Sequence, residues 1–258
     1  MNGFLFEQIV FGPIKSRRLG ISLGLNLLPQ GYKHCTFNCL YCECGWTKEP
    51  ADTSITYPAR NDIRMALEAR LTLMQRKRSM LDNITFAGNG EPTLHPDFPG
   101  IVDDTVMLRD KYYPNVEITV LSNASMAGDK AVAAALMKLD KSILKLDAGT
   151  EECFRQINNP VISITLNEIL EHLKPFRGRM IIQSLFVRGT INGQSFDNTT
   201  DREVSAWLQH IDMLRPRQVM IYSIARAPAA SGVEQVPYET LQDIARKVEA
   251  LGIETAIY

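Results

Sequence analysis

The sequence predicts an α/β protein whose parallel strands form a partial (β/α)6 barrel, TIM-like but open along one side. Short runs rich in β-branched residues alternate with longer stretches whose apolar residues recur at helical spacing, which is typical of parallel βα units. Six such units follow one another without a sustained change of composition, and 258 residues are enough for a one-domain barrel. A doubly wound sheet would use the same crossovers, and in either fold ligands lie where the strands end.

Seven segments are predicted as strands because they are short and rich in β-branched residues. The predicted strands are residues 19–27, 83–87, 116–121, 142–146, 180–187, 218–223 and 254–258. Residues 1–18 are assigned to an N-terminal extension, and residues 226–237, which contain Pro, Ala, Ser and Gly, to a long loop. The chain 1–258 is therefore interpreted as one core domain with a short extension.

Helices are predicted between these strands from apolar residues at intervals of three and four. The clearest begins at Thr200, where Thr200 and Glu203 fit a T-x-x-E capping box ahead of an apolar stripe that includes Trp207. Another ends before Gly252, a suitable stop. The predicted helices cover residues 61–77, 99–111, 129–139, 166–173, 200–214 and 241–251.

Charge and cysteine content restrict the classes of function. The chain has 28 basic and 29 acidic residues, so no overall field indicates nucleic acid or an anionic membrane as partner. No segment approaches the roughly 18 uninterrupted apolar residues of a membrane span, and no export leader is apparent. Four of the five cysteines lie within residues 35–44, a clustering that favours a metal site in a reducing compartment over disulfides. We therefore expect a cytoplasmic protein.

Three cysteines with the spacing Cys-x3-Cys-x2-Cys follow the first predicted strand: Cys35, Cys39 and Cys42. Thiolates are soft ligands that favour zinc or iron–sulfur clusters. Three thiolates leave one iron of a cubane cluster free for a small molecule, which is typical of a reactive site. A zinc-stabilised binding module completed by Cys44, His34 or a carboxylate is the alternative.

Cys44 lies beside this motif and its role is open. As a fourth ligand it would close the cluster and leave a plain electron-transfer protein. Cys153 stands alone in a helix-like segment and is predicted to be a small buried residue.

A glycine-rich segment, Gly88-Asn89-Gly90-Glu91-Pro92-Thr93, directly follows the next predicted strand. Glycines allow the backbone to turn and to approach a ligand closely, and a carboxylate beside them can pair with an ammonium group. Such a segment is usually a simple turn. Because it comes one strand after the cysteine loop, it predicts a second wall of the same ligand site.

These two motifs resemble those of the radical S-adenosylmethionine (SAM) superfamily. The resemblance implies that Cys35, Cys39 and Cys42 hold one 4Fe-4S cluster whose open iron chelates the amino and carboxylate groups of SAM. It also implies an oxidoreductase reaction in which a reduced cluster cleaves SAM to methionine and a 5′-deoxyadenosyl radical. That radical would remove a hydrogen atom from an unidentified substrate, and a protein such as flavodoxin or ferredoxin would supply the electron.

The resemblance also implies residues that contact SAM, beginning with the methionyl end at the Gly-Gly-Glu-like element. The implied SAM contacts are Gly88, Asn89, Gly90, Glu91, Tyr41, Ser122, Asn123, Gln183 and Ile224. For Ser122 and Asn123, a turn cap for the following helix is an equally good interpretation. For Gln183, the alternative is a hydrogen bond to a backbone group. Charged residues at strand ends are expected to contact the substrate or one another, namely Lys145, Asp147 and Arg226.

Three further segments, residues 12–20, 149–152 and 222–228, resemble the Fe-S oxidoreductase group related to the demethylwyosine-forming enzymes of tRNA wyosine biosynthesis. Those enzymes carry additional N-terminal cysteines for a second cluster, whereas this sequence has no cysteine before Cys35. They also capture pyruvate on a lysine, and nothing distinguishes Lys15, Lys33 or Lys145 for that role. Without a basic surplus, modification of tRNA is an alternative and not the favoured function.

Overall fold

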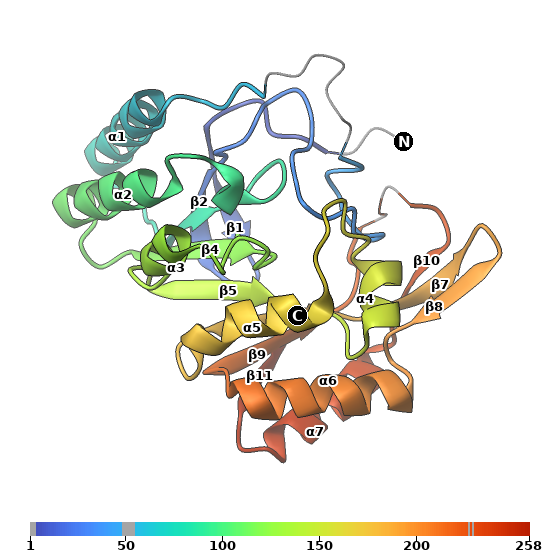
Figure 1. The fold of residues 1–258 in the computed structure, drawn as a ribbon. Coiled ribbons are helices and arrows are strands. Elements are labelled where there is room, and N and C mark those ends of the chain that lie inside the picture. The colour runs from blue at the N-terminus through green and yellow to red at the C-terminus, as the bar shows by residue number, and fades with distance from the viewer. Residues whose placement is uncertain (1–3, 48–54, 227, 229) are drawn as a thin grey trace.

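The computed structural model describes residues 4–47, 55–226, 228 and 230–258, and its main sheet forms the partial open barrel that the sequence predicts (Figure 1). The strand order is β1-β2-β3-β4-β5-β6-β9-β11, in which β1 runs antiparallel to β2 and the other neighbouring pairs run parallel. The strands are β1 (Val10–Ser16), β2 (Gly20–Leu25), β3 (Asn83–Phe86), β4 (Glu117–Ser122), β5 (Lys141–Lys145), β6 (Ile181–Leu185), β9 (Gln218–Tyr222) and β11 (Glu254–Ile257).

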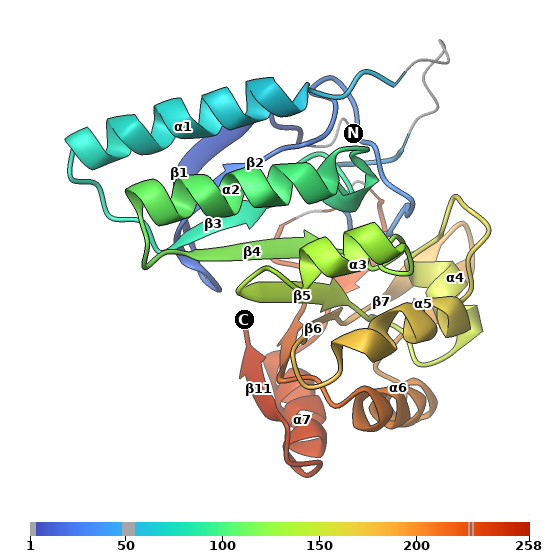
Figure 2. The ribbon, with the colours of Figure 1, turned by 60° about the vertical axis from the view of Figure 1, so that its left-hand side comes forward.

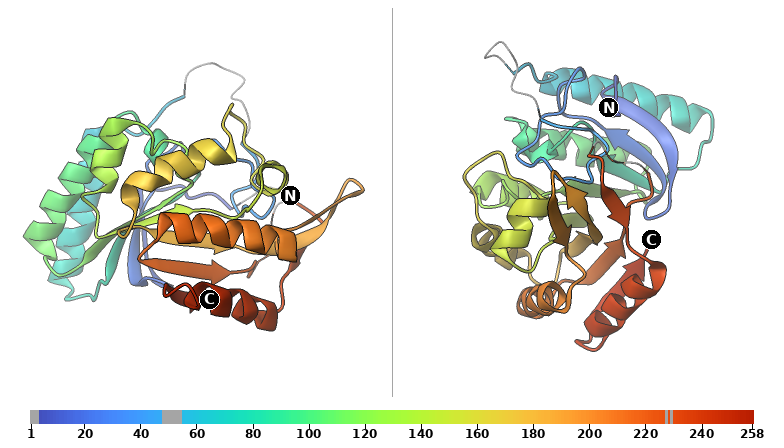
Figure 3. Two further views of the ribbon diagram at one scale, coloured as in Figure 1. Left: turned by 60° about the horizontal axis from the view of Figure 1, so that its bottom comes forward. Right: turned by 90° about the vertical axis from the view of Figure 1, so that its right-hand side faces the viewer.

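Helices cover the outer face of this curved sheet (Figure 2). Seen along the strands, β1 and β11 are the two edges, and the barrel is open between them (Figure 3). The helices are α1 (Arg60–Arg76), α2 (Phe98–Tyr112), α3 (Lys130–Leu136), α4 (Glu151–Ile157), α5 (Leu166–Leu173), α6 (Asp201–Leu214) and α7 (Tyr238–Glu249), with short 3-10 turns at η1 (Pro92–Leu94) and η2 (Lys174–Phe176). All six predicted β/α units are therefore present.

Alternate residues of each strand face the helices or the inside of the barrel. Leu144, on the helix side of β5, belongs to the main core. Ile143, Ile181 and Met220 form a separate buried cluster together with Leu19, Leu121 and Tyr258. Because these residues alternate with the helix-facing ones, they face the inside of the barrel and fill it toward the strands' amino ends. The carboxyl ends of the strands are left for polar groups.

The structure corrects three boundaries. Residues 10–16 of the predicted extension form β1, an edge strand of the main sheet. The predicted strand 180–187 ends at Leu185, and Val187 begins a hairpin. The predicted loop 226–237 contains a strand that pairs with this hairpin, forming a second sheet of β7 (Val187–Ile191), β8 (Gln194–Asp197) and β10 (Val233–Gln235).

The capping box predicted at α6 is half confirmed. The Thr200 side chain accepts a hydrogen bond from the Glu203 backbone N–H, as expected. The Glu203 carboxylate instead accepts hydrogen bonds from the backbone N–H groups of Gly149 and Thr150, at 3.1 and 3.2 Å, in the loop that follows β5. Cys153, predicted to be a small buried residue, is buried in α4. None of the helices in the described residues is long and apolar enough to span a bilayer.

Candidate functional site

A cavity of about 410 Å³ lies at the carboxyl ends of the parallel strands. Its walls come mainly from the loops that follow β2, β3 and β4 and from side chains of β4, β5, β6 and β9. Phe6 and Arg18, from the N-terminal part of the chain, complete the lining. Ligands bind at this end of parallel α/β barrels because the βα loops converge there. The cysteine loop and the glycine-rich segment are both part of the wall.

The cysteine loop and the glycine-rich segment are joined through their backbones. His34 N–H donates to the Asn89 carbonyl at 2.8 Å, and Glu91 N–H donates to the His34 carbonyl at 3.1 Å. Gly90 lies between these two bonds with a φ of 144°. A Cβ atom at Gly90 would lie 1.8 Å from the His34 carbonyl oxygen, so only glycine permits this contact.

Cys35, Cys39 and Cys42 all line the cavity. The Asn123 side-chain amide lies 3.5 Å from the Cys35 Sγ, and the Asn158 amide lies 3.6 Å from the Cys39 Sγ. Amide N–H groups directed at sulfur stabilise thiolates, and around metal clusters such contacts orient the ligands. Asn158 was not anticipated from the sequence, because it lies 119 positions from Cys39 and only the fold brings them together.

Within the described residues, no three His, Cys, Asp or Glu side chains are arranged to hold one metal ion. In a cubane cluster each thiolate binds a different iron, so the sulfurs need not surround one point. Cys44 lines the same cavity, where its thiol donates to the Gly88 carbonyl at 3.4 Å.

Lys33 places a buried positive charge beside the cysteines. Its Nζ donates to the Gly45 carbonyl at 3.0 Å. Burial raises the pKa of the Cys35 thiol to about 12 and also raises the pKa of Cys39. The Lys33 charge lowers the pKa of all three thiols, so it offsets part of the cost of forming thiolates in a buried loop.

Glu91 is buried in the cavity wall. Its Oε1 accepts from the Thr93 N–H, the Thr93 hydroxyl and the Ser122 hydroxyl, at 3.1, 2.6 and 2.8 Å. Its Oε2 accepts from the Asn123 N–H at 2.6 Å and has a lone pair left. Burial raises the pKa of Glu91 although these hydrogen bonds oppose the shift. An ammonium group at Oε2 would offset the cost of the buried charge.

Three predicted SAM contacts, Asn89, Ser122 and Asn123, have hydrogen-bond partners within the protein. The Asn89 side chain bonds to the backbone of Phe6 and Pro29 and does not line the cavity. Ser122 and Asn123 do line it, but Ser122 binds Glu91, and the Asn123 amide donates to the Thr36 hydroxyl at 2.8 Å. These residues hold the two motifs in place.

Lys145 and Asp147, at the end of β5, form the predicted charged pair, with Nζ and Oδ2 3.7 Å apart. Asp147 is buried and accepts from the Tyr41 hydroxyl, from Asn158 at 2.7 Å and from the Leu185 N–H at 2.9 Å. The Lys145 ammonium lies 5.0 Å from the centre of the Tyr41 ring. Lys145 and Tyr41 line the cavity, whereas Asp147 lies behind them as their support.

Of the other predicted contacts, one lines the cavity and two do not. Gln183 lines the cavity on β6. Ile224 packs against the core and does not line the cavity. Arg226 is exposed and does not line the cavity, but it pairs at 2.8 Å with Glu43, which does.

Arg18 lines the cavity although the sequence gave no reason to select it. It lies in the turn between β1 and β2, and its guanidinium lies 5.0 Å from the centre of the Tyr222 ring at the end of β9. No motif marks this residue. Arg18 reaches the cavity because the sheet is curved, which brings the turn between β1 and β2 beside β9.

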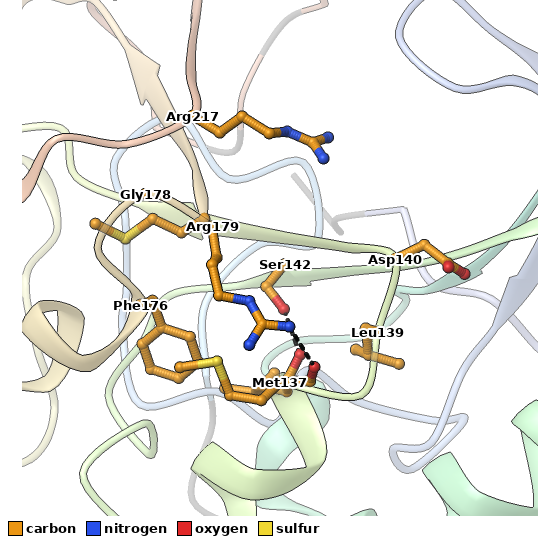
Figure 4. A pocket seen from close by; sticks show the side chains of 10 residues that line it. Met137, Leu139, Asp140, Ser142, Phe176, Gly178, Arg179 and Arg217 are labelled. Atoms are coloured by element: carbon orange, nitrogen blue, oxygen red, sulfur yellow. Dashed lines mark hydrogen bonds between the residues drawn. The ribbon is translucent and has the colours of Figure 1, made fainter.

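A smaller cavity of about 210 Å³ lies at the opposite end of the barrel, where β5, β6 and β9 begin (Figure 4). Arg179 extends along this cavity and donates to the Met137 carbonyl at 3.4 Å. Arg179 and Arg217 are both exposed. Since the amino ends of barrel strands serve stability and not ligand binding, we assign no function to this cavity.

The fold and the site define an α/β enzyme with a three-cysteine loop facing an open cavity. A family model described as the Radical SAM superfamily matches residues 31–203, and the chain therefore belongs to the radical SAM superfamily. Among solved structures, a radical SAM methyltransferase from Sphaerobacter thermophilus is 14% identical with a TM-score of 0.64, covering 92% of this chain and 65% of that one. Archaeal TYW1 is 12% identical with a TM-score of 0.54, covering 89% and 71%. At these identities the likeness shows the fold alone.

Two sequence relatives extend over most of the chain. A UPF0026 protein of Methanocaldococcus jannaschii is 28% identical over 240 residues, 92% of this chain and 70% of the relative. A protein of Brachyspira hyodysenteriae named GTPase Obg is 25% identical over 245 residues, 93% of this chain. The chain spans only 33% of that second relative's length, so its name says nothing about this chain's substrate.

Proposed function

We propose that this enzyme binds one 4Fe-4S cluster through Cys35, Cys39 and Cys42 and uses it to cleave SAM reductively. The observation that carries the proposal is the joining of the two motifs: the three thiols line the same cavity as Glu91, and the His34–Gly90 contact fixes one motif against the other. When bound, the reduced cluster supplies one electron that breaks SAM into methionine and a 5′-deoxyadenosyl radical, which takes a hydrogen atom from the substrate.

The chain's own residues would bind and orient the reactants. Glu91 accepts the SAM ammonium through its free lone pair on Oε2, and the Gly88–Gly90 backbone allows close approach. Tyr41, held by Asp147, presents its ring to the cavity. The electron comes from a reducing protein such as flavodoxin or ferredoxin.

Anaerobic reconstitution followed by iron and sulfide analysis tests the cluster. We expect about four iron and four sulfide per chain, as a cubane requires. With dithionite and SAM, the product should be 5′-deoxyadenosine. About one zinc per chain without sulfide would contradict the proposal and favour the structural zinc module.

Cysteine variants distinguish an open three-cysteine cluster from the alternative interpretations of the motif. Cys39→Ala should lose both the cluster and SAM cleavage, whereas Cys153→Ala, a buried cysteine away from the cavity, should keep both. Cys44→Ser should retain the cluster if three thiolates are the ligands. Loss of the cluster in Cys44→Ser would indicate a closed, four-thiolate electron carrier instead.

A further inference from the structure

We propose that Arg18 and Lys145 bind an anionic group of the substrate, a carboxylate or a phosphate, inside the cavity. This inference rests on the proposed function in one respect: it takes the cavity as the place where substrate meets SAM. The two cations come from opposite parts of the chain, one from the turn between β1 and β2 and the other from the end of β5. Both line the cavity.

Arg18 is half-buried and has unused hydrogen-bonding capacity at its buried Nη1. Within the described residues, its Nη1 is the buried side-chain nitrogen or oxygen that has no hydrogen-bond partner. An unpartnered buried donor is costly, and a charged one more so, unless a ligand completes it. The aromatic face of Tyr222 holds the guanidinium at 5.0 Å but accepts none of its N–H groups in the plane. The planar donors of Arg18 therefore suit a carboxylate or phosphate group.

Lys145 supplies the second charge. Its side chain is 19% exposed, and its distance of 3.7 Å from Asp147 is too long for a hydrogen bond. Burial disfavours its charge, but the Asp147 carboxylate opposes that effect and the pKa of Lys145 is raised. Tyr222, on whose ring Arg18 lies, lines the same cavity as Lys145.

The carboxylates of the cavity wall do not neutralise these cations. Glu43 pairs with Arg226 at 2.8 Å. Glu91 is held by Thr93, Ser122 and Asn123 on the loops after β3 and β4, on the side of the cavity that we assign to SAM. Asp147, behind the cavity wall, balances the charge of Lys145. One net positive charge, contributed by Arg18, is therefore left for a ligand, and an anion is the chemistry it fits.

Binding of small anions to the reconstituted protein tests the proposal. The probes are inorganic phosphate and malonate, titrated by calorimetry with saturating SAM and no reductant, so that SAM covers the iron and is not consumed. We expect one anion per chain to bind the wild type. Tighter binding of phosphate would indicate a phosphate group on the substrate, and tighter binding of malonate a carboxylate. Failure of both probes to bind would overturn the proposal.

Arg18→Gln should weaken anion binding about tenfold or more, because a hydrogen-bonded charge contributes roughly 1.5–3 kcal/mol. Arg17→Gln is the matched control, since Arg17 is an exposed arginine in the same turn, and it should bind as the wild type does. Arg18→Lys keeps the charge without the planar donors, so its affinity for the anion should lie between those of Arg18→Gln and Arg17→Gln. This variant also tests the proposal if Arg18→Gln folds poorly. Equal anion binding by Arg18→Gln and Arg17→Gln would contradict the proposal.

The affinity of Arg18→Gln for SAM shows whether Arg18 binds the substrate anion or SAM itself. If Arg18→Gln weakened SAM binding as much as anion binding, Arg18 would serve the cofactor, and the proposed substrate subsite would be wrong. Failure of the wild type to assemble a cluster or to cleave SAM would instead contradict the proposed function. The anion titration needs no turnover, so it remains informative when the reconstituted protein binds SAM but does not cleave it.

Discussion

The two ends of the barrel hold their charged side chains differently. At the carboxyl ends of the strands, Glu91 and Asp147 are buried and each accepts several hydrogen bonds. At the amino ends, Arg179 and Arg217 are exposed and Asp140 is 39% exposed. Burying a charge costs free energy unless hydrogen bonds or a ligand compensate. The difference shows which end of the fold is organised in advance for a ligand.

Replacing a glycine at each end should give the largest contrast. In Gly90→Ala the new Cβ meets the His34 carbonyl at 1.8 Å, and the backbone has a φ of 144°. We expect a loss of about 4 kcal/mol in the free energy of unfolding, from combined overpacking and backbone strain, together with loss of bound iron. Urea unfolding and iron analysis measure both.

Gly178→Ala is the matched change at the other end. Gly178 has a φ of 74°, but no heavy atom lies within 4 Å of the position of a new Cβ. It should cost about 1 kcal/mol from strain alone and leave the iron content unchanged. Equal losses in the two variants would remove the contrast between the ends.

A second pair compares carboxylates. Asp147→Asn removes the charge that faces Lys145 and places a donor where Asn158 donates, so it should lower the free energy of unfolding by about 2 kcal/mol. Asp140→Asn, in an exposed pair with Arg109, should cost about 0.5 kcal/mol. Denaturant titrations of both variants provide the measurement, and a greater loss in Asp140→Asn would contradict the expectation.

The smallest effect concerns pH. Burial raises the pKa of Glu91 above its ordinary 4.5, so the unfolded chain releases this proton at a lower pH than the folded protein does. Between the two pKa values the folded state binds more protons, and stability therefore falls as pH rises above about 4.5. Glu91→Gln lacks this titration. The free energy of unfolding of the wild type, relative to Glu91→Gln, should decrease as pH rises through this window, and a constant or increasing difference would contradict the assignment.

Much of the fold could be predicted from local pattern. The helix expected at 61–77 is observed as Arg60–Arg76, and the strand expected at 83–87 as Asn83–Phe86, because apolar periodicity reports which face is buried. β7, β8 and β10 were not predicted, since they are short and mostly polar and exist through pairing with one another. β1 was missed because Gly12 and Pro13 interrupt its pattern.

The candidate site divides in the same way. The cysteine spacing and Gly88–Glu91 were visible in the sequence because each set is local, and the family match supports that interpretation. The sequence did not show that Asn89 supports the backbone or that Arg226 pairs with Glu43. A side chain's type limits what it can bind, but its direction is set by neighbours far along the chain.

The sequence by itself determined the class of this protein, because the three cysteines of the motif lie within eight consecutive residues and a βα pattern follows them. Only the tertiary structure decided which charges face the cavity. Arg18 and Lys145 are 127 positions apart by number, and they line the same cavity because the curvature of the open sheet brings its first hairpin beside Tyr222 at the end of β9. Spacing along the chain carries no record of that approach, since it arises from strand order and from packing inside the barrel.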